Sequence, residues 1–206
     1  AACQQTGAQA VHPGYGFLSE NLGFAERLAD AGITFIGPSP DHLRDFGLKH
    51  TARNLAQAAG VPLLPGSDLL DTVEEAVQQA ARIDYPVMLK STAGGGGIGM
   101  QLCADEAALR SAFESVARTA TASFGDARVF LERFVAEARH VEVQVFGDGA
   151  GRVLALGERD CSLQRRNQKV VEETPAPLLP QAVRQALHGA ATALCASVSY
   201  ASAGTV

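Results

Sequence analysis

Hydrophobic positions along the chain follow two patterns. Short apolar runs that end at glycine or proline predict β-strands, and longer stretches with apolar residues three or four positions apart predict helices. In the first third of the chain the two patterns alternate, which is typical of a layered α/β domain. We expect strands at 10–14 and 33–37, the second one buried, and helices at 19–32, 40–46 and 48–59.

Helix signals and breakers place the boundaries. Ser19 is the expected N-cap of the first helix, and Gly32 follows its last turn. Proline and glycine mark 61–70 as the expected domain boundary. Asp71 and Glu74 then predict a capping box at the start of the next helix.

The remaining two thirds of the chain contain more strands than helices. The pattern predicts a hairpin that turns at the sequence GDGAG. The expected elements are strands at 86–90, 98–103 and 129–135, the hairpin at 140–158, and helices at 105–118 and 180–196.

Residues 85–103, YPVMLKSTAGGGGIGMQLC, place Lys90 before a run of glycines. A Walker A loop needs its lysine after the glycines, so that interpretation fails. Gly94, Gly96 and Gly99 match a dinucleotide fingerprint, but a strand follows instead of the required helix. A plain exposed turn rarely needs five glycines, because each one costs about 0.5–1 kcal/mol when it is ordered. We therefore predict a flexible hairpin lid, in which Lys90 and backbone N–H groups bind phosphate.

Residues 158–173, ERDCSLQRRNQKVVEE, combine four cations, four acids and several amides. Cations of this kind can hold a small anion such as bicarbonate or phosphate, and amides can bind a base or a ribose. A solvated charged strand and loop would have the same composition. The segment alone leaves both interpretations open.

Composition narrows the class of protein. The net charge is −5 and basic residues are scattered, which argues against a nucleic-acid partner. No apolar run has the length of a membrane span. The four cysteines are far apart and form no metal-binding pair, so we expect reduced, mostly buried thiols in a cytoplasmic protein. The first residues contain no initiating methionine and the last ones resemble an interrupted strand, so we expect a fragment.

Four motifs resemble the biotin carboxylase family, whose members share the ATP-grasp fold. They are HPGYGFLSEN (12–21), GGGGIGM (94–100), RHVEVQVFGDG (139–149) and ERDCSLQRRNQKVVEETPAP (158–177). Most members have arginine in place of Ile98 and histidine in place of Asn167. These departures, with GLKHTAR around Lys49, look like the urea carboxylase branch.

The resemblance implies an α/β chain of three parts. Residues 1–60 correspond to the end of a doubly wound N-terminal domain and its linker helices. Residues 61–134 correspond to the mobile ATP-grasp lid, and 135–206 to the start of the central domain. The family's Mg²⁺ ligands and catalytic arginine lie beyond Val206, so no metal ligand is expected in this chain.

By the same resemblance, Lys169 is the catalytic lysine that binds bicarbonate. Tyr15 and Gly16 border the biotin ring, although GYG could equally be a tight turn. Val135 is expected in the core, with only its backbone free to bind. The residues expected to bind ATP are Lys49, Lys90, Gly96, Gly97, Glu132, Arg133, Val135, His140, Gln164 and Asn167.

The implied reaction is ATP-dependent carboxylation of biotin. Bicarbonate attacks the γ-phosphate of MgATP to give carboxyphosphate, and the released CO₂ reacts with biotin. The expected partners are a biotin carboxyl carrier domain and a carboxyltransferase domain, and self-association into a homo-oligomer is left open. The alternatives are the same component of an acetyl-CoA, propionyl-CoA or pyruvate carboxylase, and a non-catalytic nucleotide-binding module. The motifs argue against another ATP-grasp ligase, such as half of a carbamoyl phosphate synthetase.

Overall fold

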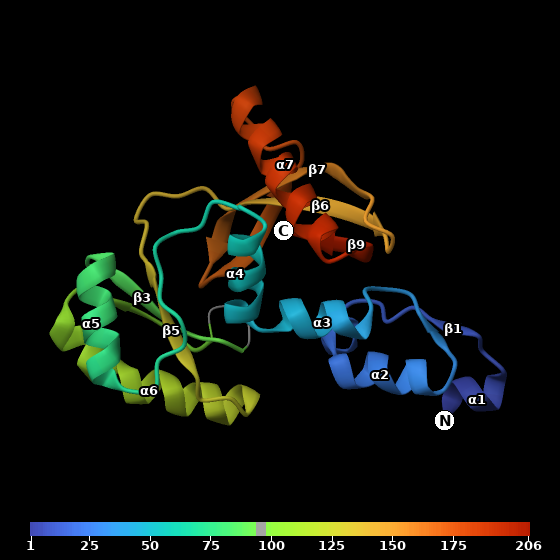
Figure 1. Ribbon diagram of the computed structural model, residues 1–206, viewed down its shortest axis with the longest axis horizontal. Helices are drawn as coiled ribbons and strands as arrows, with labels where there is room; N and C mark the ends of the chain where they lie inside the picture. Colours follow the sequence, from blue (N-terminus) through green and yellow to red (C-terminus); the bar gives the residue numbers. More distant parts are fainter. Residues whose placement is uncertain (94–97) are drawn as a thin grey trace.

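Three separate small sheets organise the computed structural model, which describes residues 1–93 and 98–206 (Figure 1). A two-stranded parallel sheet lies in the N-terminal part, a three-stranded antiparallel sheet in the middle, and a four-stranded antiparallel sheet in the C-terminal part. Figure 1 shows α4 at the centre of the view, between the parts that carry these sheets. No helix of the described residues is long and apolar enough to cross a membrane.

The N-terminal part has helices and two short strands. Strand β1 pairs in parallel with β2, and α2 connects them and packs against β2. Its elements are α1 (Ala2–Thr6), β1 (Ala10–Val11), η1 (Phe17–Glu20), α2 (Leu22–Asp30), β2 (Thr34–Phe35), α3 (Pro40–Gly47) and α4 (Lys49–Ala58).

Two details of this part differ from the sequence-based prediction. Ser19 lies in η1, and α2 is capped by Asn21, whose side chain accepts the Phe24 N–H at 2.8 Å. The strand expected to be buried is only two residues long, and Ile36 beside it is half exposed, since a two-stranded sheet buries only part of each strand. Gly32, two residues after the end of α2, has a φ of 66°, as predicted for a helix-ending glycine.

The middle sheet, which we call the lid sheet, has the strand order β4-β3-β5. Helix α5 begins with a capping box formed by Thr72 and Glu75, one residue later than predicted. Its small residues Ala76 and Ala80 are fully buried and let α5 approach the sheet closely. The elements are α5 (Val73–Ile83), β3 (Val87–Ser91), β4 (Met100–Cys103), α6 (Glu106–Phe124) and β5 (Val129–Arg133).

The C-terminal sheet, which we call the central sheet, has the order β8-β7-β6-β9, and α7 packs on one of its faces. Strands β6 and β7 form the predicted hairpin. The charged segment 158–173 also pairs with itself, because β7 continues through it and β8 returns beside it. The elements are β6 (Val141–Asp148), β7 (Val153–Arg165), β8 (Gln168–Glu173), α7 (Gln181–Ser197) and β9 (Ala201–Thr205).

A buried carboxylate joins α7 to the central sheet. Glu158 on β7 is 2% exposed and accepts hydrogen bonds from Arg184 Nε at 2.7 Å and from the Ala176 N–H at 3.2 Å. The His188 Nε2 atom lies 2.8 Å from its other oxygen. Burial alone would raise the pKa of Glu158, but the bonds from Arg184 and His188 outweigh it and bring the pKa to about 2.

Candidate functional site

Two of the predicted ATP-binding residues meet on the lid sheet. Lys90 on β3 and Glu132 on β5 are diagonal neighbours, because Lys90 pairs with Phe130 and Met88 pairs with Glu132. Val87 and Leu89 point into the core, so the alternation of β3 places Lys90 on the opposite face. There its ammonium donates to Glu132 Oε2.

A third side chain, which the sequence did not single out, completes this group. Arg53 on α4 donates from Nη1 to Glu132 Oε1 at 3.1 Å and from Nη2 to the Leu64 carbonyl. Arg53 is the last residue of the GLKHTAR motif, but its carboxylate partner lies 79 residues further along the chain, so the motif alone does not indicate this contact. We call Lys90, Arg53 and Glu132 the lid cluster.

Lys49 begins α4 and lies against Ser91 and Thr92 at the end of β3. Its backbone N–H donates to the Thr92 carbonyl at 3.0 Å, and its ammonium donates to the Ser91 carbonyl at 3.4 Å. Burial and the nearby charge of Lys90 lower the pKa of Lys49. The next residue, His50, places Nδ1 2.5 Å from Thr92 Oγ1. The predicted ligands Gly96 and Gly97 lie outside the described residues.

Two other predicted ATP-binding residues, at and beyond the end of β5, do not join the lid cluster. The Arg133 guanidinium donates to the Ile83 carbonyl at 3.0 Å and to Asp84 at 3.3 Å, at the end of α5. The Val135 side chain was expected in the core but is 42% exposed, because it follows the last paired residue of β5. If Arg133 or Val135 binds ATP, it does so through its backbone groups or after its side chain has changed conformation.

A second charge cluster lies on the central sheet. Glu142 on β6 is directly opposite Arg159 on β7, which donates from Nε to Glu142 Oε1 at 2.8 Å. Lys169 on β8 donates to Oε2 of the same carboxylate. Burial alone would raise the pKa of Glu142, but the bonds from Lys169 and Arg159 outweigh it and lower the pKa. Glu142, Arg159 and Lys169 form what we call the sheet cluster.

Two more predicted residues border the sheet cluster. The Gln164 amide donates to His140 Nδ1 at 2.8 Å and to the Cys161 carbonyl at 2.9 Å. His140 Nε2 is 3.9 Å from Glu142 Oε2. The structure thus brings His140, Gln164 and the predicted catalytic residue Lys169 to one region of the central sheet.

Three predicted residues lie apart from both clusters. Asn167 is exposed at the tip of the β7–β8 hairpin, with a φ of 63°. Tyr15 and Gly16 are exposed in the N-terminal part, and Gly16 has a φ of 109°. Tyr15 lines a cleft of about 720 Å³, whose other wall includes Gln144 and Phe146 of β6.

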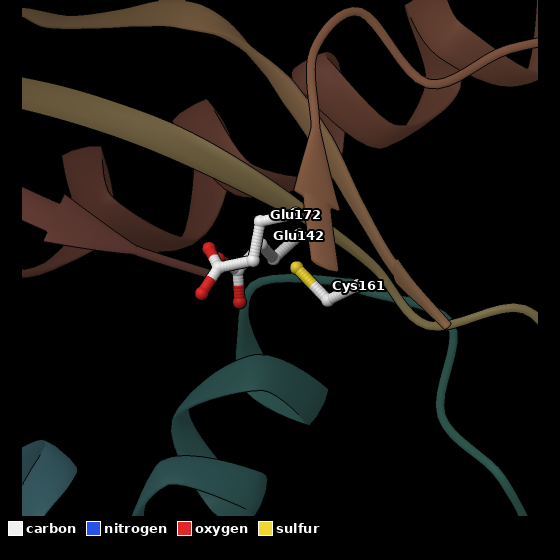
Figure 2. Close-up of side chains that lie close together, drawn as sticks. All are labelled: Glu142, Cys161 and Glu172. Carbon is white, nitrogen blue, oxygen red and sulfur yellow. The ribbon is translucent and has the colours of Figure 1, made fainter. Parts of the chain in front are cut away.

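Figure 2 shows Glu142, Cys161 and Glu172 close together, with one potential ligand atom of each within 4.8 Å of the others. Protein cations already neutralise the carboxylates, since Arg159 Nε is also 3.5 Å from Glu172. Burial, assisted by the charge of Glu142, raises the pKa of the Cys161 thiol, and a protonated thiol is a poor metal ligand. The group fits protein cations better than a metal ion.

Known proteins match the chain along its whole length. Residues 49–206 match the family model of the carbamoyl-phosphate synthase L chain, ATP binding domain, and residues 1–43 match that of the biotin carboxylase N-terminal domain. Urea amidolyase of Saccharomyces cerevisiae is 60% identical over 100% of this chain and 11% of its own length. The propionyl-CoA carboxylase alpha chain of Ruegeria pomeroyi is 51% identical over 100% of this chain and 30% of its own length. The chain therefore spans less than a third of either relative.

Solved structures agree with these matches. The biotin carboxylase–βγ-ATP complex from Campylobacter jejuni is 45% identical with a TM-score of 0.96, over 99% of this chain and 46% of that one. The biotin carboxylase domain of the Hydrogenobacter thermophilus 2-oxoglutarate carboxylase, in complex with MgADP, ADP and bicarbonate, is 44% identical with a TM-score of 0.95, over 99% and 45%. These matches confirm the predicted α/β fold class and the predicted family. The ATP-binding domain of the chain is of the type found in the carbamoyl-phosphate synthase L chain. The chain belongs to the biotin carboxylase family and has the ATP-grasp fold.

Proposed function

We propose that this chain is the nucleotide- and bicarbonate-binding part of an enzyme that carboxylates biotin at the expense of ATP. The observation that carries the proposal is the presence of two cation–carboxylate clusters, one on each antiparallel sheet. The lid cluster presents Lys90, and the sheet cluster presents Lys169. Each lysine is held in place by a carboxylate, so both cations are positioned before any anion arrives.

On the nucleotide side, Lys49 and Lys90 supply the positive charge for the phosphates. They approach from different elements, the start of α4 and the end of β3, and the Lys49 ammonium donates to the carbonyl of Ser91, the last residue of β3. Glu132 and the backbone of β5 border the position of the adenine and ribose. A relative with 45% identity forms a βγ-ATP complex, which supports a nucleotide at this place.

On the bicarbonate side, Lys169 supplies the charge that binds the anion, and Arg159 stabilises Glu142 when Lys169 turns toward it. His140 and Gln164 border the same region and complete the nucleotide contacts. Catalysis then consists mainly of positioning two anions against each other and neutralising the charge that develops on transfer. The Hydrogenobacter relative is described with bicarbonate and MgADP, which supports this pairing.

Mg²⁺ accompanies ATP and neutralises phosphate charge. The acidic side chains Glu142 and Glu172 do not fit it, because Arg159 and Lys169 bind them. We propose that its ligands lie in sequence that follows Val206 in a longer protein. In that protein, residues 1–60, 61–134 and 135–206 correspond to the N-terminal domain with its linker, the lid and the start of the central domain.

We further propose that urea is the final carboxyl acceptor. The 60% identity with a urea amidolyase exceeds the 51% identity with a propionyl-CoA carboxylase chain, and the changes at Ile98 and Asn167 fit the same branch. Biotin would be carried on a carboxyl carrier domain, and a carboxyltransferase domain would choose the acceptor.

The test is ATP turnover by the full-length protein with bicarbonate and each acceptor in turn: urea, acetyl-CoA, propionyl-CoA and pyruvate. We expect urea to stimulate turnover and the others to have no effect. Stimulation by a CoA thioester or pyruvate, without stimulation by urea, would make the acceptor assignment wrong and leave biotin carboxylation standing.

A further inference from the structure

Arg53 is the one member of the lid cluster to which the proposed function gives no task. We propose that Arg53 is a positioning residue: it holds one oxygen of Glu132, so that Lys90 can leave the other oxygen and bind a nucleotide phosphate. The proposal rests on the proposed function, because it concerns the same nucleotide site.

Arg53 and Lys90 contact different oxygens of the Glu132 carboxylate. Arg53 Nη1 is 3.1 Å from Oε1, whereas Lys90 Nζ contacts Oε2. The side chains are largely shielded from water, with exposed fractions of 14% for Arg53, 19% for Glu132 and 23% for Lys90. Neither cation needs to move for the other to bind.

The guanidinium has a fitted place between α4 and the lid sheet. Its Nη2 donates to the Leu64 carbonyl, and its planar group lies against the backbone of Gly66. A Cβ on Gly66 would come within 2.8 Å of both the guanidinium and the Leu131 carbonyl. Gly66 also bridges to Glu132 by backbone pairing, so the same glycine positions both partners. This arrangement fixes the direction from which Arg53 reaches the carboxylate.

This geometry makes release of Lys90 less costly. A carboxylate that is mostly buried and loses its only cation is left with an uncompensated charge, which is strongly unfavourable. With Arg53 in place, Glu132 keeps one charge-assisted hydrogen bond after Lys90 turns toward a phosphate. Without Arg53, Glu132 would compete with the nucleotide for Lys90, and nucleotide affinity would fall.

The test compares Arg53→Gln, Arg53→Lys and the control Gln57→Ala, which lies at an exposed position of the same helix. ATP dissociation constants are measured by isothermal titration calorimetry on the full-length protein, together with KM values for ATP and bicarbonate. We expect Arg53→Gln to weaken ATP binding about tenfold, which corresponds to about 1.4 kcal/mol. The KM for bicarbonate should change less than about twofold, Arg53→Lys should restore part of the loss, and Gln57→Ala should have no effect.

A double-mutant cycle separates positioning from general damage to the fold. In a Glu132→Gln background the carboxylate is absent, so Arg53→Gln should change ATP affinity less than about twofold. Equal effects in both backgrounds would overturn the proposal, as would unchanged ATP affinity in Arg53→Gln. If Arg53→Gln does not fold, Arg53→Lys is measured in both backgrounds. A loss of ATP affinity that is equal in the wild-type and Glu132→Gln backgrounds would then overturn the proposal, because Glu132 would play no part in the effect. A wild-type protein that binds no ATP would instead contradict the proposed function.

Discussion

Replacing Glu158 with glutamine should weaken the attachment of α7 to the central sheet. The amide has nearly the same shape as the carboxylate, so the substitution removes charge and leaves packing intact. Arg184 and His188 then lose the group that they both bind, and the guanidinium remains three-quarters buried without its partner. The substitution lowers the stability of the fold, because the positive charge of Arg184 stays mostly buried without a negative partner.

The pKa of Glu158 sets the size of the effect. A fall from the ordinary value of 4.5 to about 2 means that the native state binds the ionised form more strongly than the unfolded chain does. The difference corresponds to about 3 kcal/mol of stability at neutral pH. A pKa that is depressed in the folded state gives stability that is complete well above pH 4.5 and is lost as the pH falls from 4.5 toward 2. The advantage of wild type over the variant should therefore shrink by about 1 kcal/mol between pH 7 and pH 4.

The assay is thermal unfolding of the purified chain, followed by circular dichroism at pH 7 and at pH 4. At pH 7 we expect the midpoint of Glu158→Gln to lie about 6–12 °C below wild type. Glu114→Gln is the matched control, because Glu114 forms an exposed ion pair with Arg118 and should cost less than about 0.5 kcal/mol. A Glu158→Gln midpoint within about 2 °C of wild type at pH 7, or a loss that is no smaller at pH 4, would refute this reasoning.

Two further predictions concern packing and thiol access. Gly147→Ala should prevent the pairing of β6 with β9 and cost several kcal/mol in urea unfolding, because its Cβ would lie 1.9 Å from the Tyr200 carbonyl oxygen. Gly189→Ala, in α7 with no atom near the new methyl group, should instead stabilise the chain by about 0.5–1 kcal/mol; a loss of stability there would contradict the packing described. Labelling with a thiol reagent at pH 8 should modify only Cys3 in the native chain and all four cysteines after denaturation. Rapid native labelling of more than one thiol would contradict the burial of Cys103, Cys161 and Cys195, the last of which has a pKa raised by burial to about 11.

The sequence predicted the main helices and strands because their signals are local. Gly32 ends a helix at a left-handed position, as predicted, and α6 begins at Glu106, next to the predicted start at residue 105. The errors were also local, because several acceptors compete at a helix start. Asn21 caps α2 in place of Ser19, since the chain around Ser19 already forms a turn of 3₁₀-helix.

The charged segment was ambiguous in sequence because its hydrophobic pattern is weak. Half of its positions carry charge, so β8 was missed, and pairing with β7 decided its structure. Similarly, Arg53 and Arg159 lie within motifs of the sequence, but neither motif indicates that these two side chains belong to a site. The structure identifies them by their ion pairs with carboxylates on other strands: Arg53 with Glu132, and Arg159 with Glu142. Long-range ion pairs of this kind depend on tertiary packing, which the local sequence does not report.

The most direct measurement of the central claim is ADP release by the full-length protein with free biotin and bicarbonate, for wild type and for Lys169→Ala. We expect wild-type release to require both bicarbonate and biotin. Loss of one charge-assisted contact, worth about 1.5–3 kcal/mol, should lower bicarbonate-dependent release by Lys169→Ala about tenfold to a hundredfold, while ATP affinity stays within about threefold. ADP release that ignores bicarbonate and biotin, or a variant whose bicarbonate dependence equals that of wild type, would contradict the account.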